Sequence, residues 1–180
     1  RPGGRGGPVW RRARAVGLGA LVTLVLLAAA SVAGLLPLQV MRVDSGSMAP
    51  TIEAGDLLLV DHRQGPVHRG DVVAVENPAG GGLLVKRVVG VGGDRVGIED
   101  GVLVVNGTPV CEPAIDPTLI DGVYFGPVTV PPGELFLLSD HRDRSIDSRT
   151  FGTVPASELV GFVRSRLWPS PGGLPTTGSC

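Results

Sequence analysis

The sequence predicts a mainly β protein, in which an antiparallel β domain follows one N-terminal transmembrane helix. Two observations lead to this prediction. A long apolar stretch without charged residues lies near the N-terminus, between residues 15 and 41. After Pro37 the apolar runs become short and Val-rich, and the chain of 180 residues holds 28 Gly and 16 Pro. Short β-branched runs bounded by turn residues are typical of antiparallel sheets.

The uncharged stretch is long enough for one membrane crossing, over residues 16–36. A helix rises about 1.5 Å per residue and needs roughly 20 residues to cross the hydrocarbon core. Five arginines precede it and Arg42 alone follows closely. This bias predicts that residues 1–15 are a basic cytoplasmic N-terminus and that the rest of this single-pass chain is extracytoplasmic. A cleavable signal peptide ending near Ala28-Ala29-Ala30 is the alternative, although its apolar core would be unusually long.

Residues 38–167 are predicted to form an extracytoplasmic β domain. Asp100-Gly101 marks its clearest hairpin, because Asp-Gly suits a two-residue turn. Side chains alternate along a strand, so Leu84, Lys86 and Val88 are expected on one face and an exposed Arg87 on the other. The apolar runs predict seven strands, over residues 56–60, 71–75, 83–91, 95–99, 102–105, 135–138 and 159–167.

Charge and composition argue against several other classes of protein. The formal net charge is −1, which gives no reason to expect a nucleic-acid partner. The three histidines are scattered among polar loop residues, and Cys111 and Cys180 lack the CxxC spacing of a zinc or redox site. No metal or other cofactor is therefore expected. The two cysteines are expected to be unpaired thiols, although an outward-facing domain could form a disulfide.

Residues 168–180 are predicted to be a flexible tail, because they are rich in Pro and Gly. Within them, Leu174-Pro175-Thr176-Thr177-Gly178 matches a sortase sorting pentapeptide. Such a signal is normally followed by a hydrophobic span and a basic end, and here only Ser179 and Cys180 follow. We therefore interpret the match as a chance occurrence.

Ser47 and Lys86 are the candidate catalytic pair. A serine hydroxyl is a weak nucleophile until a base removes its proton. A buried lysine can be that base, because desolvation favours the neutral amine. Ser47 lies in a Ser/Gly-rich turn, and Lys86, the only lysine of the chain, shares an apolar strand face. A turn serine and a strand-edge lysine without catalytic roles are the structural alternatives.

Three segments resemble the sequence boxes of the bacterial type I signal peptidases, peptidase S26. Ser45-Gly46-Ser47-Met48-Ala49-Pro50-Thr51 is similar to their nucleophile box, and Lys86-Arg87-Val88-Val89-Gly90 to their lysine box. Their C-terminal box resembles Asp140-His141-Arg142-Asp143-Arg144-Ser145-Ile146-Asp147-Ser148-Arg149. Three boxes in the right order are a specific signal. The resemblance spans about residues 43–161 and implies a coiled antiparallel β-sheet fold.

The resemblance also implies a role for each site residue. Ser47 would be the nucleophile and Lys86 the general base, with an oxyanion hole made by the Ser45 hydroxyl and the Ser47 backbone N–H. Ser145 would orient the Lys86 amine, and Asp147 with Arg149 would brace the site. Asp44, Ser139 and His141 depart from the family pattern, which leaves the local loop geometry open. The shallow substrate pockets would be lined by Met41, Val43, Met48, Ile52, Leu84 and Val85.

The function predicted from the resemblance is that of a membrane-anchored serine endopeptidase. It would remove N-terminal signal peptides from exported preproteins through an acyl-enzyme, preferring small residues at positions −1 and −3. Its partners would be preprotein signal peptides and membrane lipid. The self-cleaving Ser/Lys repressors are set aside, since this chain has an anchor and no room for a DNA-binding domain. A specialised or inactive signal peptidase-like protein that binds peptides is the remaining alternative.

Overall fold

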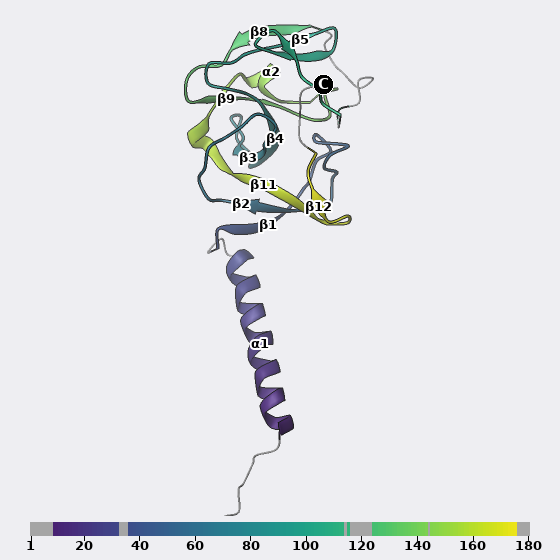
Figure 1. Ribbon diagram of the computed structural model, residues 1–180. Helices are drawn as coiled ribbons and strands as arrows, with labels where there is room; N and C mark the ends of the chain where they lie inside the picture. Colours follow the sequence, from purple (N-terminus) through teal and green to yellow (C-terminus); the bar gives the residue numbers. More distant parts are fainter. Residues whose placement is uncertain (1–8, 33–35, 114, 116–123, 144, 176–180) are drawn as a thin grey trace, which may run out of the picture. The chain divides into compact units, whose positions relative to one another are not determined.

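The computed structural model describes residues 9–32, 36–113, 115, 124–143 and 145–175. The chain divides into two units, Arg1–Gln39 and Val40–Cys180. The first unit contains helix α1 (Val9–Val32), and the second contains the β domain (Figure 1). The fold class predicted from the sequence is confirmed, since the domain is built from antiparallel strands and one apolar helix precedes it.

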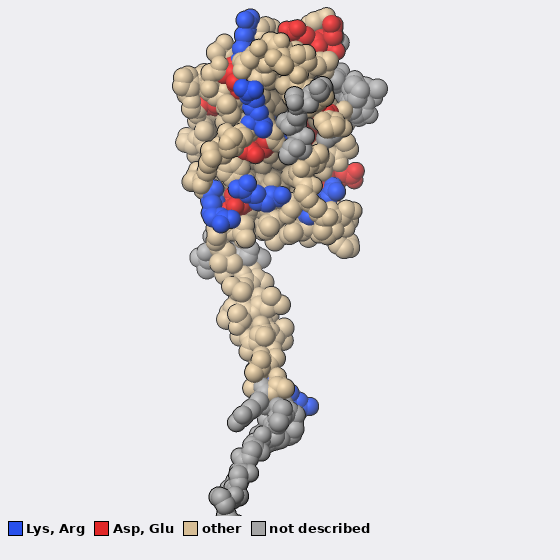
Figure 2. Space-filling view, in the orientation of Figure 1, with Lys and Arg blue, Asp and Glu red and all other residues tan. Residues whose placement is uncertain are grey.

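Helix α1 is long and apolar enough to cross a membrane over Ala13–Ala30. None of that window is buried, and the helix surface between Val16 and Leu27 presents Leu and Val side chains outward. Figure 2 shows this surface without acidic or basic side chains along most of its length. The helix begins before the predicted span of residues 16–36 and ends at Val32, while residues 33–35 lie outside the described part of the chain. An all-round apolar surface suits lipid better than water.

The strands form two sheets. The larger has the order β1-β2-β11-β3-β4-β9-β10, with β12 paired to β11, and the smaller has the order β7-β6-β5-β8. Figure 1 shows β5 and β8 at the opposite end of the domain from β2 and β11. The strands are β1 (Leu38–Arg42), β2 (Leu57–Asp61), β3 (Val72–Glu76), β4 (Leu83–Val91), β5 (Arg95–Glu99), β6 (Val102–Val105), β7 (Thr108–Pro109), β8 (Phe125–Thr129), β9 (Glu134–Leu138), β10 (Val154–Pro155), β11 (Leu159–Trp168) and β12 (Gly172–Gly173).

All seven strands predicted from the sequence are present, each within one residue of its expected bounds. Five further strands were not predicted. Three of these, β7, β10 and β12, contain two residues each and are too short to show a periodic pattern. Strand β8 contains Gly126 and Pro127, which are unfavourable in strands, and β1 lies directly after the apolar helix. The short helices α2 (Ser148–Phe151) and η1 (Ala156–Glu158) also lack a readable period.

The larger sheet curls because β11 bends as it pairs with two neighbours. Its C-terminal half pairs with β2 and its N-terminal half with β3. The register shifts between Leu159 and Gly161, between Val163 and Ser165, and again between Arg166 and Trp168. Such irregularities increase strand twist and bending. One product of this curl is a buried apolar cluster, called here the first core cluster, of Val43, Met48, Ile52, Leu58, Val60, Val72, Ala74 and Val163.

The C-terminal segment differs from the expected flexible tail as far as Pro175. Gly172 and Gly173 pair with Arg166 and Ser165 of β11, and Leu174 packs against the first core cluster. Sequence composition could not show this docking, because Gly and Pro are equally common in free and in docked irregular segments. Residues 176–180 lie outside the described part of the chain, so most of the sorting-like pentapeptide does too.

Cys111 is disulfide-bonded, and the prediction of an unpaired thiol at this position is wrong. The chain has one other cysteine, Cys180, which lies outside the described residues. Spacing along the sequence does not report which residues come together in space, and this is why the bond was not predicted.

Candidate active site

Ser47 lies on a compact turn between β1 and β2, called here the nucleophile turn (residues 43–56). Backbone hydrogen bonds close it, from Ala49 N to the Gly46 carbonyl at 3.0 Å and from Ile52 N to the Met48 carbonyl at 2.9 Å. The side chains of Met48 and Ile52 are buried in the first core cluster. These two residues anchor the turn in the core, and Ser47, directly before Met48, lies half-buried at the surface.

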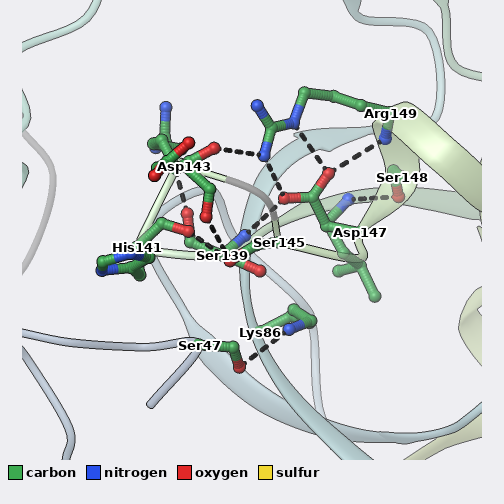
Figure 3. A network of polar contacts seen from close by, with 11 residues as sticks. Ser47, Lys86, Ser139, His141, Asp143, Ser145, Asp147, Ser148 and Arg149 are labelled. Atoms are coloured by element: carbon green, nitrogen blue, oxygen red, sulfur yellow. Dashed lines mark hydrogen bonds and ion pairs between the residues drawn. The ribbon is translucent and has the colours of Figure 1, made fainter. Parts of the chain in front are cut away.

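Lys86 lies on β4 and points toward Ser47 (Figure 3). Its Nζ donates a hydrogen bond to Ser47 Oγ at 3.0 Å, although 39 positions separate the two residues in the chain. Strand β4 is an interior strand between β3 and β9, and Lys86 is paired with Val73 of β3. The structure therefore brings together the two residues that the sequence predicted as nucleophile and base.

Burial lowers the pKa of Lys86 below the ordinary value of a lysine. The side chain is 2% exposed, and desolvation of the charged amine is the largest cause of the shift. The carboxylates of Asp147 and Asp140 act in the opposite direction, and Arg149 adds to the lowering. Desolvation dominates, so the Lys86 ammonium loses its proton more readily than an exposed lysine would. A neutral amine beside a hydroxyl is the arrangement that a general base requires.

Ser45 lies close to the nucleophile and is exposed. Its Oγ is 3.4 Å from Ser47 Oγ. A hydroxyl at this place can donate to an anionic oxygen that develops next to Ser47. The position is compatible with the oxyanion role that the resemblance implies for Ser45.

One buried carboxylate holds together the described residues of the loop between β9 and α2, residues 139–143 and 145–147. Asp147 is fully buried and caps α2, accepting from Arg149 N at 3.1 Å. Its other oxygen accepts from Ser139 N at 3.1 Å, and the Arg149 guanidinium donates to both oxygens at 2.9 and 3.0 Å (Figure 3). Arg149 also donates to the Arg142 carbonyl at 2.8 Å. The pair of Asp147 and Arg149 thus links the backbone of Ser139 to that of Arg142, and its role as a brace of the site stays a prediction.

This loop contacts the nucleophile turn through His141. The backbone N–H of His141 donates to the Ser47 carbonyl at 3.0 Å. Ser145, which was expected to orient the Lys86 amine, donates a hydrogen bond from its hydroxyl to the His141 carbonyl. Ser145 is therefore linked to Ser47 through two hydrogen bonds of the His141 backbone, and its role in orienting the Lys86 amine stays a prediction.

Arg87 is buried, which corrects the expectation of an exposed charge. It is 1% exposed, because β4 is covered on both faces. Its guanidinium forms a bidentate pair with Asp140, with distances of 2.8 and 2.6 Å, and donates to the Gly70 carbonyl at 3.0 Å. Breaking a buried pair of this kind by removing one partner typically costs about 3–5 kcal/mol. The pair joins the strand of Lys86 to the loop of His141.

An open groove of about 830 Å³ leads to the dyad. Of the predicted pocket residues, Leu84 alone lines it among the described residues. Val43, Met48 and Ile52 lie in the first core cluster, and Met41 and Val85 pack against that cluster. Apolar side chains near a turn pack in the core where the core is adjacent. Sequence position alone could not show which of these residues pack in the core and which line the groove. The groove is lined by Ser45, Gly46, Ser47, Ala49, Leu84, Lys86, His141, Asp143, Ser145 and Ile146.

Two of the three departures from the family pattern have a visible consequence. The Ser139 hydroxyl is buried without a hydrogen-bond partner in the described part of the chain, which is unfavourable for a polar group. His141 lines the groove, so its ring borders the space available to a substrate. Asp44 is exposed. No cluster of three or more His, Cys, Asp or Glu side chains suited to a metal ion occurs among the described residues.

Comparison with known proteins places this site in a wider context. A family model described as signal peptidase, peptidase S26, matches residues 16–168. A signal peptidase I of Bacillus caldolyticus is 40% identical over 142 residues, covering 71% of this chain and 78% of the relative. Signal peptidase I V of Bacillus subtilis is 34% identical over 139 residues, covering 68% and 81%. A solved signal peptidase I from Enterococcus faecalis aligns with a TM-score of 0.49 at 28% identity, covering 56% and 99%.

Proposed function

Because the chain belongs to the signal peptidase family, peptidase S26, and is thus a serine endopeptidase, we propose that it removes N-terminal signal peptides from exported preproteins with a Ser47/Lys86 dyad. One observation carries the mechanistic part of this proposal. The buried amine of Lys86 lies 3.0 Å from Ser47 Oγ at the end of an open groove.

In the first half of the proposed reaction, the neutral Lys86 amine accepts the hydroxyl proton of Ser47. Oγ then attacks the carbonyl carbon of the scissile peptide bond. The backbone N–H of Ser47 and the hydroxyl of Ser45 stabilise the negative charge on the carbonyl oxygen. The Lys86 ammonium gives its proton to the leaving amine, which is the new N-terminus of the mature protein. The signal peptide stays bound to Ser47 as an ester.

In the second half, the neutral Lys86 amine accepts a proton from a water molecule that attacks the ester carbonyl. The same two donors stabilise the second tetrahedral intermediate. Collapse of the intermediate breaks the bond to Oγ, and Lys86 returns the proton to Ser47. The signal peptide leaves with a free carboxylate and the enzyme is regenerated. Asp147 and Arg149 maintain the loop geometry during both halves, and Ser145 does so through His141.

We propose a preference for small residues at positions −1 and −3 of the substrate. Ala49, Leu84 and Ile146 line the groove that contains Ser47. Their side chains are apolar and can contact apolar side chains of a substrate. Small apolar side chains on an extended peptide suit a shallow surface of this kind.

The direct test is a cleavage assay with the full chain purified in detergent. A preprotein with an Ala-X-Ala site should be cut once, and N-terminal sequencing of the mature product should place the cut directly after the second alanine. A substrate with Trp at position −1 should resist cleavage. Cleavage at other sites, or none by a folded protein, would contradict the proposed function.

Ser45→Ala is expected to lower kcat by about 10²–10³-fold, because removal of one preorganised oxyanion donor has an effect of this order. KM should change little, since the lost interaction forms only when charge develops on the carbonyl oxygen. Steady-state kinetics on the same preprotein measure both quantities. Equal losses of kcat in Ser45→Ala and in the exposed control Ser157→Ala would exclude an oxyanion role.

We further propose that α1 anchors the protein with its N-terminus in the cytoplasm and the β domain outside. Five arginines precede the apolar segment, and basic residues are retained on the cytoplasmic side. A tag after Cys180 should then be digested when protease is added to wall-stripped cells, whereas a tag before Arg1 should be protected. Protection of the C-terminal tag, or a soluble form cut near Ala30, would refute this topology.

A further inference from the structure

We propose that the C-terminal segment, defined as residues 166–175, is a positioning element for the catalytic dyad. This inference rests on the proposed function. The segment contacts the nucleophile turn that carries Ser47 and also the residue next to Lys86. No sequence box covers it, and residues 168–175 were expected to belong to a flexible tail. Three sets of contacts support the proposal.

Arg166 joins the segment to the nucleophile turn. Its Nη1 donates to the Thr51 carbonyl at 3.2 Å and lies 3.5 Å from Asp56 Oδ2, while its Nε donates to the Ser170 carbonyl at 3.0 Å. Thr51 follows Ser47 by four positions, and Asp56 closes the turn. The Asp56 carbonyl accepts from Val43 N at 2.9 Å, and its carboxylate accepts from Glu53 N at 3.0 Å. One guanidinium thus binds two points of the turn and the Ser170 carbonyl within the C-terminal segment.

Leu174 supports the turn from the core side. It packs against the first core cluster, the cluster that contains Met48 and Ile52. These two side chains anchor the backbone on either side of Pro50 and Thr51. Strand β12 places Leu174 there, since Gly172 and Gly173 pair with β11 just before it. The loss of Leu174 would leave a space beside the residues that fix the nucleophile turn.

Pro175 contacts the other half of the dyad. Its carbonyl accepts a hydrogen bond from Arg87 Nη1 at 2.8 Å. Arg87 is adjacent to Lys86 on β4, and it is the buried partner of Asp140. A buried guanidinium has more donors than one carboxylate can accept, so the Pro175 carbonyl removes an otherwise unfavourable unpaired N–H. Pro175 also shares a small surface groove with Pro50, Thr51 and Arg166.

These contacts act on the geometry of the reaction. Proton transfer requires Ser47 Oγ and Lys86 Nζ to stay within hydrogen-bond reach. A displacement of about 1 Å by a change far from the chemistry can reduce the rate about 10²-fold. The segment contacts the nucleophile turn and Arg87, and none of residues 166–175 lines the groove that contains Ser47 and Lys86, so its loss should reduce kcat and spare substrate binding.

The first experiment compares Arg166→Gln with Arg164→Gln in the full-length protein. Arg164 lies two positions earlier on β11, is 52% exposed, and binds Asp61 and the Phe162 ring instead of the nucleophile turn. We expect Arg166→Gln to lower kcat about 10–100-fold with KM within about twofold, and Arg164→Gln to resemble the wild type. The pH midpoint of kcat should stay unchanged in both, because Arg166 does not set the burial of Lys86. Rates are normalised to the folded fraction measured by circular dichroism at the assay temperature.

The second experiment separates the docked residues from the last five. A chain ending at Pro175 keeps the contacts of Arg166, Leu174 and Pro175 but lacks Cys180, the one other cysteine of the chain, so full-length Cys180→Ser is its matched control. A chain ending at Ser170 also loses Leu174 and Pro175. We expect the first truncation to keep kcat within about threefold of the wild type and the second to lose at least tenfold. Leu174→Ala should reproduce part of that loss in a chain of full length, which covers the case in which the shorter chain does not fold.

The outcomes distinguish the two proposals. If the wild type and Arg164→Gln cleave the preprotein while Arg166→Gln and Leu174→Ala match them in kcat, the positioning role is refuted and the proposed function stands. Equal losses in the two truncations and in full-length Cys180→Ser would also refute it, since the loss would then arise from the missing cysteine and not from Leu174 and Pro175. A folded wild type that does not cleave would overturn the proposed function together with this inference.

Discussion

Ser47→Ala is expected to abolish cleavage and to leave the fold intact. Removal of a serine nucleophile in another serine protease costs about 10⁶ in kcat, and we expect a loss of that order here. The Ser47 hydroxyl contacts Lys86 and Ser45 and has no packing role, so its removal creates no core cavity. A single-turnover assay with the Ala-X-Ala preprotein measures the residual rate.

A second serine provides the matched control. Ser157 is exposed in η1, and Ser157→Ala should keep the wild-type rate. Thermal melts of the two variants and the wild type should agree within a few degrees. Near-normal turnover by a folded Ser47→Ala protein would refute the nucleophile assignment.

Lys86→Arg is expected to be inactive even though it keeps a positive charge. Guanidinium does not release its proton at ordinary pH, so it cannot accept the hydroxyl proton of Ser47. A general base contributes typically 10²–10⁴-fold, and the loss of kcat should reach at least this range. Lys86→Met removes the amine while it keeps an unbranched chain, and it should be equally inactive. Activity in either variant would remove Lys86 from the base role.

The pH dependence of the wild type tests the same assignment without mutation. The neutral amine is the active form, so kcat/KM should rise with pH and level off above the pKa of Lys86. Burial lowers that pKa, so the midpoint of the rise in kcat/KM should lie below the ordinary lysine pKa of about 10.4. A profile that is flat from pH 6 to 10, or that falls over this range, would contradict a lysine base.

The sequence by itself determined the features that depend on neighbours along the chain. Alternating and Val-rich runs predicted seven strands, because each strand must cover its own stretch of the core. The uncharged stretch predicted α1, since crossing a membrane requires an uninterrupted apolar length. The three boxes predicted Ser47 and Lys86 as the catalytic pair, and the apolar neighbours of Lys86 predicted the burial that lowers its pKa. These properties arise within a few residues of each position.

Only the tertiary structure decided which distant groups meet. The burial of Arg87 against Asp140, the hydrogen bond from Ser145 to the His141 carbonyl and the disulfide at Cys111 each follow from chain segments that the curled sheet brings together. Hydrophobicity could not show which apolar residues of the nucleophile turn pack in the core and which line the groove, because apolar side chains occur in both places. The docking of Leu174 depends on a space left open by the sheet and by the nucleophile turn, and such a space exists only after both have folded.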